Sequence, residues 1–387
     1  MIKKRTVCVV SSSRADYNHL YILISKLNKS KNFNLKIIVT GMHMIKDYGY
    51  TYKEIINDGF KINKKIQINQ QQNNEESILE SISFQLKQCY RSLTNIRPDI
   101  VILLGDRYDI YPIAIACHVM KIPLAHLHGG EVTHGVIDDA FRHSISKMAD
   151  IHFTSHKDFK NRLVQMGENP KNIYNIGSLG VDAIKQMKFK SKNYICKKYN
   201  LNYKKKYFLV CIHPETLISD NKSLIECALQ ALNAFDNYNL IFTYPNSDPG
   251  SSVILKHIKE YIDNNSKCTL IKSFGRKDFL NIMKYSSGLI GNSSSGIVEA
   301  PALATPTINI GTRQTGRPIG KSIYNANSAT KSIIKAIDSA IKHNVKNKKI
   351  KSIYEGKNSV DNILKILSSL NLANIKNKKF RDIKHAK

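Results

Sequence analysis

Three acidic residues follow predicted strand ends closely enough to act together on one substrate. Asp106 and Glu131 each come shortly after an apolar run that is typical of a buried strand, and Asp139 lies at the start of the helix expected next. Arg142 and His143 lie about one turn further along that helix. Because like charges held together raise the pKa of one partner, paired carboxylates suit proton transfer. For Asp106 alone, a capping role on the following helix fits the residues equally well.

Two histidines near Glu131 raise the alternative of a metal site. His126 and His128 lie on the short strand and glycine loop that lead to Glu131. The spacing His-x-His-x-x-Glu does not match the familiar zinc patterns. We therefore predict proton-transfer chemistry at these residues, with no metal and no cofactor.

A loop of small polar residues follows the apolar run 288–291 and opens a predicted helix. Ser294, Ser295 and Gly296 lie in this loop. A helix N-terminus offers unpaired N–H groups and the positive end of the macrodipole, so the loop suits a phosphate. One N-cap residue would satisfy the helix, whereas a run of small donors favours an anion site. Glu299, one turn inside, could accept hydrogen bonds from a sugar diol, and a solvated side chain on the helix face fits as well.

Other residues at strand ends could contact the same ligand. Arg14 follows the first predicted strand and could hold a phosphate or pair with a carboxylate. His213 could bind a phosphate or a leaving group, although His-Pro could also be a simple turn. Ser273 and Phe274 lie in a loop where an aromatic ring and backbone groups could hold a base. Arg317 follows the last of the main strands, near any phosphate.

The elements that must position these residues are apolar runs alternating with helical patterns, which predicts parallel α/β sheets. The expected strand runs are 6–10, 35–39, 98–104, 122–127, 150–154 and 173–177, then 207–212, 239–243, 269–271, 288–291 and 306–310.

The length of 387 residues favours two domains of ordinary size. We expect an N-terminal α/β domain over 1–184 that carries the acid/base carboxylates, and a polar linker over 185–206. A C-terminal α/β, nucleotide-binding domain follows over 207–345. A basic helical tail over 346–387 is expected to pack back on the first domain.

The net charge of +29 brings nucleic-acid binding into consideration. The lysines are spread widely, without an arginine-rich or aromatic-interleaved cluster, so we predict a solvated basic surface that attracts an anionic substrate and no nucleic-acid partner. No apolar run approaches the about 20 residues of a membrane span, and the N-terminus lacks the features of a signal peptide. Seven scattered cysteines form no disulfide framework, so we expect a cytoplasmic protein without a membrane partner.

Five separated motifs together resemble those of the hydrolysing UDP-N-acetylglucosamine 2-epimerases of sialic-acid-type sugar biosynthesis, within the wider UDP-GlcNAc 2-epimerase superfamily. The resemblance spans most of the chain. It is carried by Ser13–Tyr17, Gly105–Arg107, His128–Glu131 with Asp138–His143, Gly291–Glu299 and Gly311–Arg317.

The resemblance implies a glycosyltransferase-B-like fold of two Rossmann-like domains with a central cleft, and a homo-oligomer, either dimer or tetramer. It implies elimination of UDP from UDP-GlcNAc and hydration of the unsaturated sugar to N-acetylmannosamine. By motif, it implies acid/base roles for the carboxylates of Asp106, Glu131 and Asp139, and a place in the cleft for His213. It also implies diphosphate and ribose contacts from Ser294, Ser295 and Glu299, and further charge contacts to the UDP-sugar from Arg14 and Arg317.

Other activities remain open at this point. Some relatives act on UDP-N,N'-diacetylbacillosamine on the way to legionaminic acid, and others isomerise UDP-GlcNAc without hydrolysis. The motifs at 14–17 and 128–131 are more similar to those of the hydrolysing branch. A glycosyltransferase of the same fold and a basic RNA-binding protein are the alternatives from other classes.

Overall fold

The computed structural model divides the chain into two compact units, each built on its own parallel sheet. The N-terminal unit comprises Met1–Glu131, Asp138–Ala183 and Gly356–Lys387, and the C-terminal unit comprises Val132–Ile137 and Ile184–Glu355. The structure describes residues 4–46, 49–69, 74–134, 136–215, 221–245, 248–343, 351–375 and 378–382.

The N-terminal unit has a seven-stranded sheet in the order β3-β2-β1-β4-β5-β6-β7. All of its neighbouring strands pair in parallel. The strands are β1 Arg5–Ser11, β2 Phe33–Val39, β3 Lys64–Lys65, β4 Ile100–Leu104, β5 Leu124–Leu127, β6 Ile151–Thr154 and β7 Ile173–Asn175. The predicted strand runs of this half are confirmed, whereas the short β3 carries no apolar signal and was not predicted.

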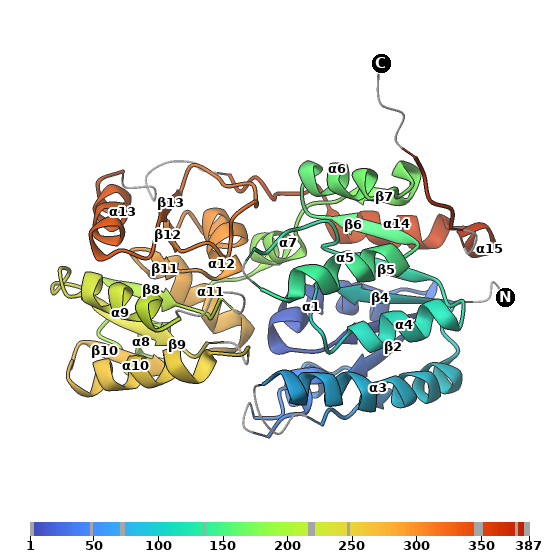
Figure 1. The fold of residues 1–387 in the computed structure, drawn as a ribbon, viewed down its shortest axis with the longest axis horizontal. Helices are drawn as coiled ribbons and strands as arrows, with labels where there is room; N and C mark the ends of the chain where they lie inside the picture. Colours follow the sequence, from blue (N-terminus) through green and yellow to red (C-terminus); the bar gives the residue numbers. More distant parts are fainter. Residues whose placement is uncertain are drawn as a thin grey trace, which may run out of the picture. The chain divides into compact units, whose positions relative to one another are not determined.

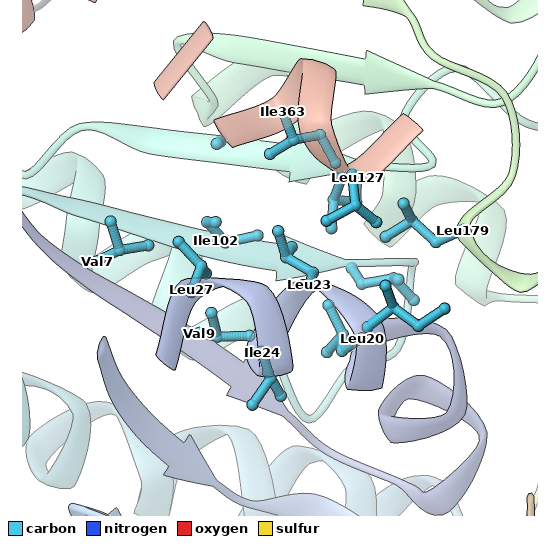
Figure 2. Close-up of a cluster of buried hydrophobic side chains, with 14 of the residues drawn as sticks. Val7, Val9, Leu20, Leu23, Ile24, Leu27, Ile102, Leu127, Leu179 and Ile363 are labelled. Carbon is cyan, nitrogen blue, oxygen red and sulfur yellow. The ribbon is translucent and has the colours of Figure 1, made fainter. Parts of the chain in front are cut away.

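Side chains on successive strand residues point to opposite faces, so the apolar runs supply two cores. Val7 and Val9 of β1 face one core, and Cys8 and Val10 face the other. Figure 2 shows the first of these cores, where leucine and isoleucine side chains of α1 (Arg14–Lys29) pack beside Val7 and Val9. A sheet covered on both faces leaves mainly the strand ends for chemistry.

Helices connect the strands of this unit. They are α1, α2 Tyr52–Asn57, α3 Glu75–Ile96, α4 Tyr111–Val119, α5 Asp138–Met148 and α6 Lys157–Gln165, with 3₁₀ turns at Gly41–Met44 and Pro170–Asn172. Helix α7 (Leu179–Gln186) follows the last strand of this unit, and its residues from Ile184 onward belong to the C-terminal unit.

Late segments of the chain also belong to the N-terminal unit. Helix α14 (Ser359–Ser369), drawn in red in Figure 1, adds Val360, Ile363 and Leu367 to the core beside α1. The short α15 (Leu372–Ile375) follows it. Further on, Lys378 inserts its ammonium 2.7 Å from a carboxylate oxygen of the buried Glu168. Of the tail expected over 346–387, residues 346–350, 376–377 and 383–387 lie outside the described part.

The C-terminal unit has a six-stranded parallel sheet in the order β10-β9-β8-β11-β12-β13. The strands are β8 Tyr207–Cys211, β9 Asn239–Thr243, β10 Cys268–Ile271, β11 Leu289–Gly291, β12 Thr307–Ile310 and β13 Ile323–Ala326. The helices are α8 Lys192–Lys198, α9 Asn221–Leu232, α10 Ser251–Asp263, α11 Gly275–Tyr285, α12 Ser294–Val298 and α13 Thr330–His343, with a 3₁₀ turn at Ala300–Leu303. The α/β architecture with two parallel sheets, predicted from the sequence, is confirmed.

The stretch 185–206 differs from the expected linker. It contains α8, and Ile195 and Cys196 of that helix are buried in a core of the C-terminal unit. A single buried pair among many lysines gives little periodic signal, which is why the sequence alone indicated a linker.

Two further observations bear on the class of protein. In the described ranges, no helix combines the length and the apolarity that a membrane crossing requires. All seven cysteines lie in described residues and are free thiols.

Candidate active site

Each sheet reverses its strand order at one place, between β1 and β4 in the N-terminal unit and between β8 and β11 in the C-terminal unit. Open α/β sheets bind ligands outside the carboxyl ends of their strands at such a reversal. Asp106 and His213 come two residues after β4 and β8 end, and Asn292 comes directly after β11. Each unit therefore presents residues with reactive side chains at the position its topology favours for a ligand.

Helix α5 organises the charged side chains of the N-terminal unit. The buried Arg142 contacts Asp106 through a guanidinium nitrogen. It also lies 3.5 Å from Asp139, and His143 lies 3.5 Å from the other oxygen of the same carboxylate. Spacings of three and four residues place these side chains on one face of the helix. The structure therefore brings together Asp106, Asp139, Arg142 and His143, as the sequence predicts.

Glu131 is buried at the end of the loop that follows β5. The Ser155 hydroxyl donates a hydrogen bond of 2.7 Å to its Oε1, and His128 Nδ1 lies 3.0 Å from the same oxygen. His128 has a φ of 64°, in the left-handed region, which turns the chain sharply before Glu131. The carboxylate is thus held in one orientation by neighbours from two elements.

The histidines near Glu131 are engaged in hydrogen bonds. Both ring nitrogens of His126 have partners, the carbonyl of Gly105 at 2.7 Å and the hydroxyl of Ser146 at 3.0 Å. In the described part of the chain, no three His, Cys, Asp or Glu side chains are grouped as a metal site would need. These contacts give His126 a structural environment rather than the open coordination of a metal ligand.

Arg14 begins helix α1, at the carboxyl end of β1. The side chain of Ser13 caps that helix by accepting the backbone N–H of Asp16 at 3.2 Å. Burial, followed by the positive charge of Arg14, lowers the pKa of the neighbouring His43 to about 3. Arg14 is thus a cation at the strand reversal of this unit.

In the C-terminal unit, Asn292 joins the two strands at the reversal. Its side-chain amide donates to the carbonyl of His213 at 2.8 Å, and its side-chain oxygen accepts the N–H of His213 at 2.7 Å. Gly291 precedes it with a φ of 137°, and a Cβ there would lie 1.9 Å from the carbonyl oxygen of Cys211, so only glycine fits. Burial, followed by the charge of Arg313, lowers the pKa of His213 to about 3, so its imidazole is neutral.

The predicted phosphate loop opens the short helix α12. Ser293 is its N-cap, and the side chains of Ser294 and Ser295 are partly exposed. Gly296 is buried, and a Cβ there would lie 2.6 Å from a methyl carbon of Thr307, so this glycine serves close packing on β12. Glu299 is only 6% exposed, which excludes the solvated helix-face alternative for it.

The loop that follows β12 supplies the cations of this unit. A guanidinium nitrogen of Arg313 lies 3.3 Å from the carbonyl oxygen of Asn292, and the Gln314 amide donates to the same oxygen at 2.8 Å. Arg317 donates to the carbonyl of Val132 at 2.9 Å and to the hydroxyl of Thr133 at 3.0 Å. Arg313 is therefore the arginine that packs beside the loop opening α12, and Arg317 anchors residues 132–133.

Comparison with known proteins decides the family. A sequence model of the family described as UDP-N-acetylglucosamine 2-epimerase matches residues 25–368. The chain belongs to this family.

Similar proteins include enzymes from several bacteria. The chain is 41% identical over 318 residues to a GDP/UDP-N,N'-diacetylbacillosamine 2-epimerase (hydrolyzing) of Campylobacter jejuni, covering 82% of this chain and 83% of that protein. It is 38% identical over 336 residues to polysialic acid biosynthesis protein P7 of Escherichia coli, covering 86% and 85%. These relatives place the chain among enzymes of the UDP-sugar 2-epimerase type.

A solved structure shares the fold. The UDP-GlcNAc 2-epimerase of Neisseria meningitidis, bound to UDP-GlcNAc, aligns with a TM-score of 0.80 at 18% identity, covering 94% of this chain and 99% of that one. This likeness confirms the predicted glycosyltransferase-B-like fold class with two Rossmann-like domains.

In this member of the UDP-sugar 2-epimerase family, the structure revises the predicted base-binding role of Phe274 but not that of Ser273. The ring of Phe274 is buried 4.8 Å from the ring of Tyr199, so it packs in the core and presents no open face to a base. The backbone around Ser273, whose hydroxyl accepts the N–H of Gly275 at 3.2 Å, remains available for that role.

Asp138 is a carboxylate that the sequence analysis did not single out. It is buried at the start of α5, whereas the side chain of its neighbour Asp139 is 29% exposed. Its burial at the start of the helix that also carries Asp139 and Arg142 makes it a further candidate carboxylate for this site. Sequence alone gives two adjacent aspartates without saying which one faces inward, because only the packing of α5 decides it.

Proposed function

We propose that the chain is a hydrolysing 2-epimerase that converts UDP-N-acetylglucosamine and water to N-acetylmannosamine and UDP, in the cytoplasm, for sialic-acid-type sugar biosynthesis. The observation that carries the proposal is the group of Asp106, Asp139 and Arg142 at one strand reversal of a family member. This group offers carboxylates for proton transfer beside a fixed positive charge. The proposal includes a homo-oligomer as the working form.

The chemistry divides into an elimination and a hydration. A carboxylate removes the proton from carbon 2 while the bond from carbon 1 to the UDP oxygen breaks, and the electron pair forms the double bond between carbons 1 and 2. Water then adds its oxygen to carbon 1 and gives up one proton to a carboxylate, while an acid delivers a proton to carbon 2 on the face opposite to the one that lost its proton. Carboxylates with tuned pKa values suit the proton transfers.

The departing diphosphate needs positive charge and N–H donors as its own charge grows. In the C-terminal unit, the N-terminus of α12 and the guanidinium of Arg313 supply both. The buried Glu299 is assigned to the ribose hydroxyls, since a carboxylate can accept hydrogen bonds from both hydroxyls of a diol.

A second substrate has a specific observation in its favour. The 41%-identical relative is named for GDP/UDP-N,N'-diacetylbacillosamine, and a Legionella pneumophila protein named for the UDP form is 33% identical over 338 residues. The reaction on that sugar would be the same elimination and hydration, with a different product sugar.

Proton NMR of the purified protein, offered each of the two UDP-sugars separately in heavy water, tests the proposal. We expect free UDP and a 2-epimeric sugar carrying deuterium at carbon 2. Release of UDP without deuterium at carbon 2 would reject the elimination route, and formation of UDP-N-acetylmannosamine would indicate the non-hydrolysing reaction. Consumption of the UDP-sugar only after a sugar acceptor is added would indicate a glycosyltransferase. Salt-sensitive RNA binding without turnover of either UDP-sugar would indicate a basic RNA-binding protein.

Variants of the carboxylates complete the test. Asp138→Asn, Asp139→Asn and Glu131→Gln keep shape but remove the proton acceptor, so each residue that transfers a proton should lose turnover while UDP binding stays close to wild type. A variant that turns over like wild type removes its residue from the mechanism.

A further inference from the structure

The imidazole of His126 joins two elements that carry predicted acid/base residues. It lies on β5, fully buried, with Nε2 2.7 Å from the carbonyl oxygen of Gly105 and Nδ1 3.0 Å from the hydroxyl of Ser146. Gly105 is the residue before Asp106. Ser146 lies on α5, four residues after Arg142 and therefore on the same side of that helix.

The partners of His126 fix its tautomer. A carbonyl oxygen can only accept, so the ring must carry its proton on Nε2 and donate to Gly105. Nδ1 is then an acceptor, and the hydroxyl of Ser146 must donate to it. Burial lowers the pKa of His126 to about 3, so this neutral form persists at physiological pH.

The loop that leads to Glu131 rests on the same pair of side chains. A Cβ at Gly129 would lie 2.9 Å from Nδ1 of His126 and 2.9 Å from the hydroxyl oxygen of Ser146. Such distances are too short for a real side chain, so the backbone at residue 129 packs directly on the hydrogen bond between His126 and Ser146. Glu131 is two residues further on.

We propose that His126 is a positioning residue that, through Ser146 and Gly129, holds the strand end carrying Asp106, the loop carrying Glu131 and the helix carrying Asp139 in one fixed arrangement. This inference rests on the proposed function, because the three carboxylates are its acid/base groups. Proton transfer depends steeply on the placement of the acid and the base, and a displacement of about 1 Å can cost about a hundredfold in rate.

Two variants remove the connection to different degrees. Ser146→Ala removes only the hydroxyl that donates to Nδ1. His126→Gln keeps an amide donor for Gly105 but has no acceptor at the position of Nδ1. Ser359→Ala is the matched control, because Ser359 is an equally buried serine of the same unit whose hydroxyl donates 2.6 Å to the carbonyl of Ile176. We expect kcat to fall about tenfold to a hundredfold in the first two variants, while KM and the Kd for UDP change less than about twofold.

A purely structural role would give a different pattern. It would lower the melting temperatures of the Ser146→Ala and Ser359→Ala variants to a similar extent. It would not lower kcat selectively while KM stays constant. Wild-type kcat in Ser146→Ala and His126→Gln, or an equal loss of kcat in the Ser359→Ala control, would overturn the inference while leaving the proposed function intact. A wild-type protein that releases no UDP from either UDP-sugar would overturn the proposed function and this inference together.

Nitrogen-15 NMR of histidine-labelled protein provides a readout that does not depend on activity. We expect the resonances of His126, assigned by their loss in His126→Gln, to show a proton on Nε2 and no titration between about pH 5 and pH 8. A proton on Nδ1, or a titration near the ordinary histidine value, would contradict the described connection.

Discussion

Glu215 tests most directly how the C-terminal unit holds Arg313, the cation proposed to bind the diphosphate. Its buried carboxylate accepts three hydrogen bonds from the loop after β12. Oε1 accepts the N–H groups of Thr312 and Arg313 at 2.8 and 2.9 Å, and Oε2 accepts the hydroxyl of Thr312 at 2.7 Å. A Cβ at Gly311 would lie 2.5 Å from Oε1, so the loop is packed directly on the carboxylate.

The cost of removing this carboxylate follows from the groups left behind. Glu215→Ala leaves the N–H of the buried Arg313 without its acceptor, at about 1–3 kcal/mol, and removes the hydrogen bond to the N–H of the exposed Thr312, at about 1 kcal/mol. We therefore expect a loss of about 3 kcal/mol in unfolding free energy. Glu215→Gln can still place an oxygen toward both N–H groups and its amide toward the Thr312 hydroxyl, which can rotate to accept. It loses mainly the charge, at a cost of about 1 kcal/mol.

Binding of UDP reports the functional consequence. The loop carries Arg313, so Glu215→Ala should weaken UDP binding about tenfold or more by calorimetry, and Glu215→Gln by only a few-fold. Glu226→Ala is the control, because the Glu226 side chain is 52% exposed on α9 and its removal should change stability by less than about 0.5 kcal/mol. Wild-type UDP affinity and stability in Glu215→Ala would refute the reasoning.

Two further predictions concern stability. Because the pKa of His126 is about 3 in the fold against an ordinary value of 6.5, the unfolded chain binds more protons than the folded chain between these values. Stability therefore decreases as the pH is lowered from 6.5 towards 3. From pH 7 to pH 5 the wild type should lose about 2 kcal/mol more unfolding free energy in urea than His126→Gln, and equal slopes would contradict this. Gly296→Ala should cost about 1–3 kcal/mol of stability because its Cβ would lie 2.6 Å from a Thr307 methyl carbon, whereas Gly320→Ala, with open space around its Cβ, should cost much less. Equal unfolding midpoints for these two alanine variants would show that the loop opening α12 adjusts without strain.

Local patterns in the sequence were sufficient where the determinants are local. Buried parallel strands are nearly continuous apolar runs, so β4 and β11 could be predicted from composition. The contacts of Asp139 with Arg142 and His143 follow from helical spacing alone.

Contacts between distant residues could not be predicted in this way. Arg317 contacts Val132, 185 residues away in the sequence, and this contact helps to join residues 132–137 to the C-terminal unit. In the sequence, Asn292 is one of several small polar residues in its loop. Only its two hydrogen bonds to His213 in the structure distinguish it from its neighbours. Likewise, two adjacent aspartates at the start of α5 look equivalent in sequence, and only packing buries the first of them.

The buried histidines supply oriented dipoles at the strand ends rather than charge. His43, His126 and His213 all have pKa values lowered to about 3, chiefly by burial, and His43 has two hydroxyl partners, Ser11 at 2.9 Å and Thr51 at 2.8 Å. For His213 the second cause is the charge of Arg313, so a cation on both side chains at once is disfavoured. In the proposed reaction, therefore, Arg313 carries the positive charge beside the departing diphosphate. His213 contributes a neutral hydrogen bond, and the protons of carbon 2 move through the carboxylates.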